Sequence, residues 1–508
     1  MTDDSFDKSG GRVGTRPPVF TEGGDRGTGT VYTDEQINAA LQGRGVVNST
    51  DNFGHGTASA GTAAGNGRAT GNGVPAGMFR GVAPESDLII VKVGDCGGLN
   101  GAYVLGTVWV AQTARALKRP VVINHSLGTQ HTSHAGDEFE EQVMNGLAGA
   151  GKPGVAITVS AGNEGVYSLH AGGRFGPRRE GQKDIRSSPV ELFVSPERTE
   201  KVTWLNAYFR TEDEWGLLLR GSGNFLVDEK GAPLLCYVFK VGGTVKVALQ
   251  PGARKPDYFD DFAEAVLKYT ALASMDAGLD RVNIPLPPGS YYLWAFGATE
   301  KVRHGTFDLY LPFFQQAGFT VGGDKRQMVG SPGNAANVIT VGAYDFREQW
   351  PALNGRQVSY NLNLGAISNY SNPGGPKPNG GFKPEIAAPA TYTVSPLSRS
   401  AAPEGKGCGG ENMGTGLGPD SVTRDGHHIA WSGTSAAAPY TAGVIALMFQ
   451  KNSDLDAAQI KSILTKTATK GDALVGAVPN PEWGYGKLNP AAAVAATPRP
   501  APARRPRR

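Results

Sequence analysis

Short apolar runs separated by helical patterns are the feature that most restricts how this chain can fold. The runs lie at Asp87–Val93, Pro120–Asn124, Gly154–Ser160 and Val338–Val341. Nearly continuous β-branched runs of this length are typical of strands that are covered on both faces. Helical patterns at Tyr103–Leu117 and Asp137–Gly149 lie between the first three runs. This order predicts an α/β fold, in which a parallel sheet has helices on both faces.

The strand pattern changes at about residue 185. Up to about residue 325, the candidate strands alternate apolar with polar residues, and turn signals such as Pro287-Pro288-Gly289 separate them. These candidates are Lys201–Tyr208, Leu234–Phe239, Thr244–Leu249, Tyr291–Phe296 and Thr306–Tyr310. Such alternation is typical of antiparallel sheets with one solvated face, and a structureless loop of this length is rare. We therefore predict an inserted antiparallel β-sandwich domain at residues 186–324.

The remaining segments define the other predicted units. Residues 1–30 are polar and rich in Gly, Pro and Thr, so we expect an irregular lead-in. Helices are predicted at Asp34–Leu41, Ser435–Gln450 and Leu455–Thr467. Residues 31–185 and 325–495 then form one discontinuous α/β domain. Residues 496–508 are rich in Pro, Ala and Arg, cannot bury apolar area, and are predicted to be disordered.

Composition argues against several classes of function. The formal net charge of +3 depends on the arginines of the last ten residues. The predicted domains therefore lack the excess of positive charge that is typical of nucleic-acid-binding proteins. The three cysteines are spread widely, which argues against a disulfide framework or a zinc motif but leaves a single disulfide open. No apolar run is long enough for a membrane span, and the N-terminus lacks an apolar signal region. We expect a soluble protein, cytoplasmic unless a segment precedes Met1.

Two short motifs carry residues that are suited to acyl-transfer chemistry. His55 begins a helix of small residues, which can pass through a crowded centre, although a structural buried histidine would also explain it. Ser435 follows Gly433 and Thr434 at a helix N-terminus, where backbone N–H groups and the helix dipole act on its hydroxyl. An ordinary N-cap serine explains Ser435 but not Pro439, which removes an N–H group from the first turn.

A third motif ends an apolar strand with an asparagine. In Val159-Ser160-Ala161-Gly162-Asn163, the asparagine comes directly after the strand candidate. Ligands bind at the carboxyl ends of strands in open α/β sheets, and an asparagine N–H there can stabilise a developing oxyanion. A plain turn asparagine is the alternative, and the motif alone does not decide between the two.

The three motifs together resemble the subtilase family. Gly54-His55-Gly56-Thr57, Ser160-Ala161-Gly162-Asn163 and Gly433-Thr434-Ser435-Ala436 occur in the order of that family. The resemblance covers most of residues 31–185 and 325–495, and it implies a subtilisin-like parallel sheet. It also implies that His55 is the general base, Ser435 the acyl-forming nucleophile and Asn163 a donor of the oxyanion hole. A serine endopeptidase is therefore expected.

The resemblance also implies how a substrate binds. Asn124-His125-Ser126-Leu127-Gly128 is similar to the family's substrate-binding edge strand, against which an extended peptide adds by backbone hydrogen bonds. Ser126, Leu127, Gly128 and Gly162 are assigned to substrate binding. The expected partner is a peptide or protein substrate in extended conformation, with no nucleic acid and no membrane span. No cofactor is required, no metal ligand is assigned, and structural calcium stays open.

The third member of the catalytic triad has no candidate that fits. In the family, the acid precedes the histidine and follows an apolar strand. The acidic residues ahead of His55 follow no such run; they are Asp3, Asp4, Asp7, Glu22, Asp25, Asp34, Glu35 and Asp51. Asp51 lies where the family often has an additional aspartate. We expect that the first strand and its aspartate are absent, through a start site placed too late or a truncated gene.

This absence motivates a second functional hypothesis, a catalytically impaired subtilase fold that binds peptides or acts as a scaffold. An α/β-hydrolase is excluded because Ser435 lacks the Gly-x-Ser-x-Gly setting and no histidine follows it. A metal site at His125, His131 and His134 is not favoured, because their spacing is that of a loop. We expect these histidines on a solvated loop.

Overall fold

The computed structural model describes most of the chain. The described residues are 30–94, 102–176, 184–195, 203–222, 235–241, 244–249, 274–275, 279–286, 288–311, 317–378, 380–401 and 419–500. The lead-in before residue 30, the tail after residue 500, and Cys96 and Cys408 lie outside them. None of the helices in the described ranges is long and apolar enough to span a membrane.

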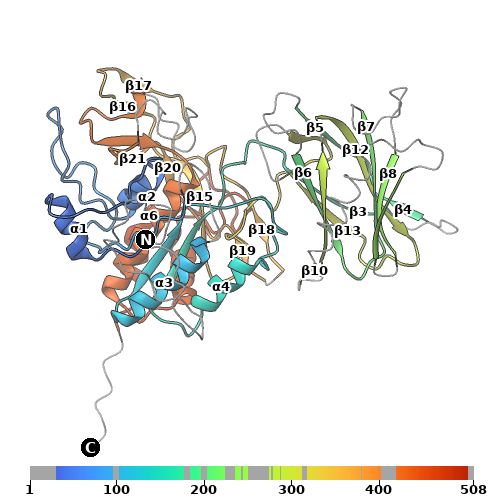
Figure 1. The fold of residues 1–508 in the computed structure, drawn as a ribbon, viewed down its shortest axis with the longest axis horizontal. Helices are drawn as coiled ribbons and strands as arrows, with labels where there is room; N and C mark the ends of the chain where they lie inside the picture. Colours follow the sequence, from blue (N-terminus) through green and yellow to red (C-terminus); the bar gives the residue numbers. More distant parts are fainter. Residues whose placement is uncertain are drawn as a thin grey trace, which may run out of the picture.

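A four-stranded parallel sheet forms the centre of the α/β part, on the left in Figure 1. Its order is β1-β2-β15-β20, and every neighbouring pair is parallel. The strands are β1 (Val121–His125), β2 (Val155–Ser160), β15 (Ile339–Asp345) and β20 (Ile386–Thr391). All six residues of β2 and all six of β20 are buried, which agrees with their continuous apolar sequences.

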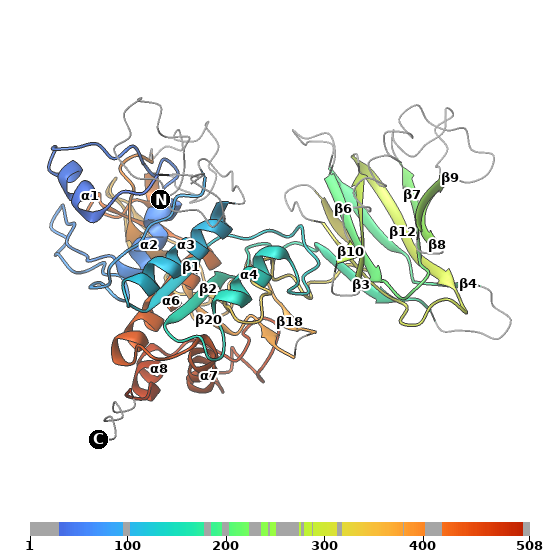
Figure 2. The same cartoon turned by 60° about the horizontal axis from the view of Figure 1, so that its bottom comes forward.

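Helices cover both faces of this sheet, as predicted. Val155 and Ile157 of β2 pack with α3 (Ala102–Ala116) and α4 (Phe139–Leu147) on one face. Ala156, between them in β2, packs with α6 (Thr434–Lys451) on the other face. Figure 2 shows α3 and α4 beside β1 and β2, with α6 behind them.

The other helices and short strands of this part lie around the central sheet. The helices are α1 (Asp34–Leu41), α2 (His55–Ala64), α7 (Ala457–Thr467), α8 (Pro490–Ala496) and the 3-10 helix η2 (Pro419–Ser421). The two-stranded sheets pair β16 (Gln349–Pro351) with β17 (Gln357–Ser359), β18 (Gly375–Pro376) with β19 (Phe382–Lys383), and β21 (Thr393–Pro396) with β22 (His428–Trp431).

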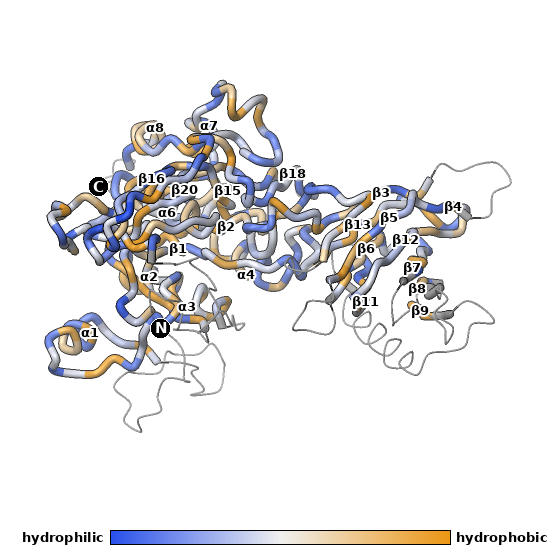
Figure 3. Tube along the Cα trace, turned by 90° about the horizontal axis from the view of Figure 1, so that it is seen from above, coloured by the Kyte–Doolittle hydropathy of each residue, from blue (hydrophilic) through white to orange (hydrophobic). Residues whose placement is uncertain are grey.

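Two antiparallel sheets form the other end of the molecule (Figure 3). One has the order β10-β11-β6-β13-β3, with β10 (Ser274–Met275), β11 (Leu279–Leu286), β6 (Thr203–Arg210), β13 (Thr306–Tyr310) and β3 (His170–Arg174). The other has the order β14-β5-β12-β7-β8-β9, with β4 also on β12. Its strands are β14 (Ala317–Val321), β5 (Val190–Val194), β12 (Gly289–Ala298), β7 (Gly216–Ser222), β8 (Leu235–Val241), β9 (Thr244–Leu249) and β4 (Asp184–Arg186). Leu205 and Val282 of the first sheet share one apolar core with Leu217 and Leu293 of the second.

Two features differ from the sequence analysis. Asp87–Val93 was predicted as a strand, but residues 88–93 are not in a strand, and Leu88 and Ile90 are half-exposed. An apolar run becomes a strand only where a neighbour supplies its hydrogen bonds, and no strand of the described ranges pairs with this segment. The antiparallel part also includes β3, which precedes the boundary placed at residue 186 and pairs with β13.

Candidate active site

Gly433 and Pro439 set the position of Ser435 at the start of α6. Ser435 is the second residue of this helix, and Gly433 before it has a φ of 126°, a left-handed value that favours glycine. Pro439 has no N–H to bond the carbonyl oxygen of Ser435. The Ser126 hydroxyl donates to that oxygen instead, at 2.8 Å. The Ser435 side chain is nearly buried, and its hydroxyl lies 3.4 Å from the Ser126 carbonyl oxygen.

Asn163 follows β2 and is held through its side-chain oxygen. Asn163 Oδ1 accepts hydrogen bonds from the Thr434 N–H at 2.8 Å and from the Thr434 hydroxyl at 2.9 Å. The amide nitrogen of Asn163 is therefore the group that remains to donate. Together with the Ser435 N–H near the start of α6, it offers donors for a negatively charged oxygen.

His55 is the first residue of α2 and packs edge-on against Trp431 of β22. The two ring centroids lie 5.5 Å apart at an interplanar angle of 89°. Burial lowers the pKa of His55 from its ordinary 6.5, and the charge of Asp51 opposes this effect. The lowered pKa favours the neutral imidazole, the state that a general base requires. The helix α2 packs so closely against Pro396 that a Cβ on Gly61 would lie 2.1 Å from the Pro396 side chain.

Asp51 holds the start of α2 and does not bond the imidazole of His55. Its Oδ1 accepts the Gly54 N–H at 2.8 Å, and its Oδ2 accepts both the N–H and the hydroxyl of Thr57 at 2.7 Å. Both carboxylate oxygens thus serve the unpaired donors of a helix N-terminus. In the part of the chain that the structure describes, no carboxylate is hydrogen-bonded to His55.

The predicted substrate-binding residues differ in how their backbone groups are used. Ser126, Leu127 and Gly128 follow β1, and the carbonyl oxygens of Ser126 and Leu127 accept serine hydroxyls. The Gly162 N–H donates to the Thr434 hydroxyl at 3.1 Å, and its carbonyl oxygen accepts the Asn372 N–H at 3.1 Å. Gly162 therefore supports the site through internal bonds, and its φ of 108° favours glycine.

All the predicted site residues line one cavity of about 2140 Å³. Its lining includes His55, Ser126, Leu127, Gly128, Gly162, Asn163 and Ser435. Residues 87–94 and β1 line the same cavity, and within the described ranges no strand pairs with the outer edge of β1.

Glu164 is a site residue that the sequence analysis did not single out. Its Oε2 accepts the Asn163 N–H at 2.9 Å and the Gln130 side-chain N–H at 3.0 Å, and the Asn372 amide donates to the same atom. Burial raises the pKa of Glu164, against the lowering effect of these hydrogen bonds. Its position directly after Asn163 was the only feature of the sequence that could have indicated its role. Its side-chain partners, Gln130 and Asn372, are distant in sequence.

The three clustered histidines do not form a solvated loop, so that expectation was wrong. His125 and His134 are buried, and His131 is partly buried. His125 Nε2 lies 3.1 Å from the Thr107 hydroxyl, whereas His134 Nδ1 lies 2.8 Å from the Val329 carbonyl oxygen. Each ring is therefore engaged separately. Across the described ranges, no three His, Cys, Asp or Glu side chains gather as a metal site.

Comparisons with known proteins agree on one family. A subtilase family model matches residues 30–189 and 261–486. A subtilisin of Bacillus sp. (strain TA39) is 36% identical over 141 residues, which are 27% of this chain and 28% of that protein. The subtilisin-like serine protease Pen ch 13.0101 of Penicillium rubens is 34% identical over 131 residues, 25% of this chain and 28% of that protein. The alignments thus span little more than a quarter of these curated relatives.

A solved structure extends the likeness to the whole fold. The CspB protease of Clostridium perfringens matches with a TM-score of 0.63 and 21% sequence identity, over 92% of this chain and 86% of that one. At this identity, the match concerns the fold. With the family match over more than half of the chain, the conclusion is that this protein belongs to the subtilase family.

Proposed function

We propose that this chain is a serine endopeptidase that hydrolyses peptide bonds through an acyl-enzyme at Ser435. The observation that carries the proposal is that His55, Asn163 and Ser435, from three separate elements, border one cavity. Membership of the subtilase family supports the same reaction class. The substrate is a peptide or protein segment that lies extended along Ser126–Gly128.

Each of the three residues has one chemical role. The Ser435 hydroxyl attacks the scissile carbonyl carbon while its proton passes to His55, which then gives the proton to the leaving amine. The negative charge on the carbonyl oxygen is stabilised by the Asn163 amide and the Ser435 N–H. Water then hydrolyses the acyl-enzyme by the same route and frees Ser435.

The engagement of Asp51 favours a second candidate, a peptide-binding protein with impaired catalysis. Both oxygens of Asp51 bond the start of α2, so this carboxylate is not free to orient the His55 ring. A Ser435–His55 dyad without an acid would work about 10⁴ times more slowly than a complete triad, as in subtilisin without its aspartate.

A fluorophosphonate probe separates the two candidates. The proposal expects covalent labelling of the wild-type protein, none of Ser435→Ala, and unchanged labelling of Ser462→Ala, a serine of α7. Labelling that persists in Ser435→Ala would remove Ser435 as the nucleophile. Peptide binding without any labelling would favour the binding protein.

We also propose that the two antiparallel sheets form an inserted domain, joined to the catalytic part by two chain crossings. The apolar core shared by β6, β11, β7 and β12 supports this division. Limited proteolysis should release a stable fragment that contains both sheets. Cleavage throughout the sheets, with no stable fragment, would contradict it.

A further inference from the structure

The five-stranded sheet has a polar outer face that is nevertheless buried. In β6, Leu205 and Phe209 point into the apolar core, so Asn206 and Tyr208 must point to the opposite side of the sheet. Asn206 is 0% and Tyr208 only 2% exposed, although both face away from that core. Something other than the second sheet must therefore cover this face.

The covering element is the loop that follows the predicted substrate-binding segment. The His134 ring of this loop stacks on Tyr310 of β13, with centroids 4.0 Å apart and an interplanar angle of 10°. Arg281 of β11 donates to the carbonyl oxygen of His131 at 3.3 Å. The His170 ring of β3 also lies close to Tyr310, with centroids 4.6 Å apart. The sheet thus holds the loop at two separate points.

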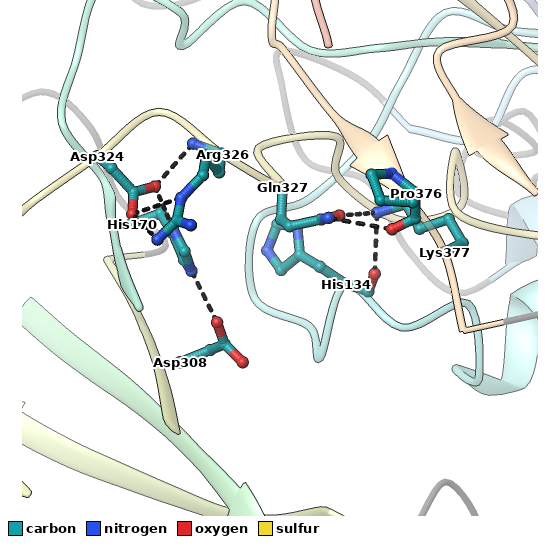
Figure 4. Close-up of polar contacts among 8 residues, drawn as sticks. All are labelled: His134, His170, Asp308, Asp324, Arg326, Gln327, Pro376 and Lys377. Carbon is teal, nitrogen blue, oxygen red and sulfur yellow. Dashed lines mark hydrogen bonds and ion pairs between the residues drawn. The ribbon is translucent and has the colours of Figure 1, made fainter. Parts of the chain in front are cut away.

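The loop is also fixed from the side of the catalytic part. The Lys377 ammonium group donates to the carbonyl oxygen of His134 at 3.1 Å and to the Gln327 side chain at 2.8 Å (Figure 4). The two ring nitrogens of His134 lie 2.8 Å and 3.2 Å from the carbonyl oxygens of Val329 and Gln130. His134 is therefore clamped between the two parts of the molecule.

Gln130 connects this loop to the oxyanion corner. Its backbone carbonyl meets the His134 ring, while its side-chain N–H donates to Glu164 Oε2 at 3.0 Å. The same carboxylate oxygen accepts the Asn163 N–H at 2.9 Å. Gln130 is only 6% exposed, so water does not readily replace this contact. A continuous set of contacts runs from Tyr310 through His134, Gln130 and Glu164 to Asn163.

We propose that the five-stranded sheet positions the oxyanion donor of the active site, with Gln130 as the positioning residue through which it acts. This inference rests on the proposed function, because it gives Asn163 a role in the reaction. A shift of Asn163 by a fraction of an ångström weakens its bond to the transition-state oxyanion more than substrate binding. Loss of the Gln130 donor should therefore lower kcat and leave KM nearly unchanged.

The decisive variant is Gln130→Met, which keeps the side-chain length and removes the donor. The rate of Ser435 labelling by a fluorophosphonate and kcat on a peptide substrate should both fall roughly tenfold, with KM changed by less than about twofold. Gln142→Ala is the matched control, because this exposed glutamine donates to the Asp137 carbonyl oxygen at 2.9 Å and does not touch Glu164. An unchanged labelling rate in folded Gln130→Met overturns the inference.

A second pair of variants tests the sheet itself and covers the case that Gln130→Met does not fold. Tyr310→Leu removes the stacked ring and should slow labelling in the same direction, whereas Tyr310→Phe keeps the ring and should not. Equal labelling rates in both Tyr310 variants would contradict the role of the sheet. Absence of labelling in the wild-type protein would instead defeat the proposed function, and with it this inference.

Discussion

The β20 side of the parallel sheet is closed, whereas the β1 side opens onto the cavity of the candidate site. On the closed side, every residue of β20 is buried, and the buried Lys383 and Glu385 form an ion pair at 2.9 Å. On the open side, Leu88 and Ile90 are 53% and 50% exposed, and described residues add no strand to the outer edge of β1. Neither edge of the sheet has a further strand within the described ranges, but Ala387 of β20 bonds the backbone of Gly486 and Leu488, so that edge is covered.

The proposed catalytic residues also differ from one another in how they are held. Ser435 and Asn163 are fixed by bonds to Ser126 and Thr434, within the well-packed region around β2 and α6. His55 has aromatic neighbours but no carboxylate bonded to its ring among the described residues. The proposed nucleophile and oxyanion donor are thus held by hydrogen bonds, whereas the ring of the proposed base is not held by a carboxylate of the described residues.

The largest effect on kcat/KM should come from adding a strand with an aspartate beside β1. We predict that joining an apolar strand that ends in aspartate ahead of Met1 raises kcat/KM by up to about 10⁴, because an aspartate would hold the tautomer of His55 and stabilise its charged form. The same extension ending in asparagine is the control, since it can pair with β1 but carries no charge. A gain below about tenfold would mean that an acid within residues 1–508 already serves.

A smaller effect should follow from loss of the proposed oxyanion donor. Asn163→Ala should lower kcat by roughly 10²–10³ with little change in KM, because its amide stabilises the oxyanion and not the bound substrate. Asn354→Ala is the control, as this exposed asparagine donates only to Asp420 at a distance from the cavity. Steady-state kinetics decide, and an effect confined to KM would contradict the role of Asn163.

Stability should show the same contrast between the two sides. Ile386→Ala in β20 should cost about 2–5 kcal/mol of unfolding free energy, because the side chain is fully buried. Ile90→Ala should cost about 0.5 kcal/mol or less, because this residue is half-exposed and has no strand partner in the described part of the chain. Urea unfolding measures both variants. Equal losses would mean that the segment at residues 87–94 is packed after all.

The sequence predicted correctly those strands that have a neighbouring strand to pair with. The strands found at Thr244–Leu249 and Thr306–Tyr310 have the predicted bounds, and the α/β class was confirmed. Asp87–Val93 has an equally good strand pattern, but a pattern does not reveal whether a neighbouring strand exists to pair with it. The wrong prediction there marks the open side of the sheet.

The candidate site divides in a similar way. Local motifs led to His55, Asn163 and Ser435 as candidates, because turns with glycine and proline leave a signal in consecutive residues. The contacts of Glu164 with Gln130 and Asn372 left none, because they join residues far apart in the chain. The burial of His134 could not be predicted either, since the surface that covers it belongs to the antiparallel part.

The smallest predicted effect concerns His170, where the two parts of the molecule meet. Burial disfavours its charge, but hydrogen bonds to Asp308 at 3.0 Å and Asp324 at 2.6 Å outweigh this and raise the pKa of His170 above 6.5. The other groups near this pair are Arg326, which bonds Asp324, and the stacked rings of Tyr310 and His134.

A raised histidine pKa stabilises the folded protein fully below pH 6.5, and this contribution is lost as pH rises through the folded value. The urea midpoint of the antiparallel part should therefore be lower at pH 9 than at pH 6, and His170→Gln should reduce that difference. His304→Gln is the control, because His304 pairs with Glu212 at 2.8 Å on the exposed surface, where such pairs contribute little. If His170→Gln leaves the pH dependence unchanged, the alkaline loss arises from other groups and not from the charge of His170.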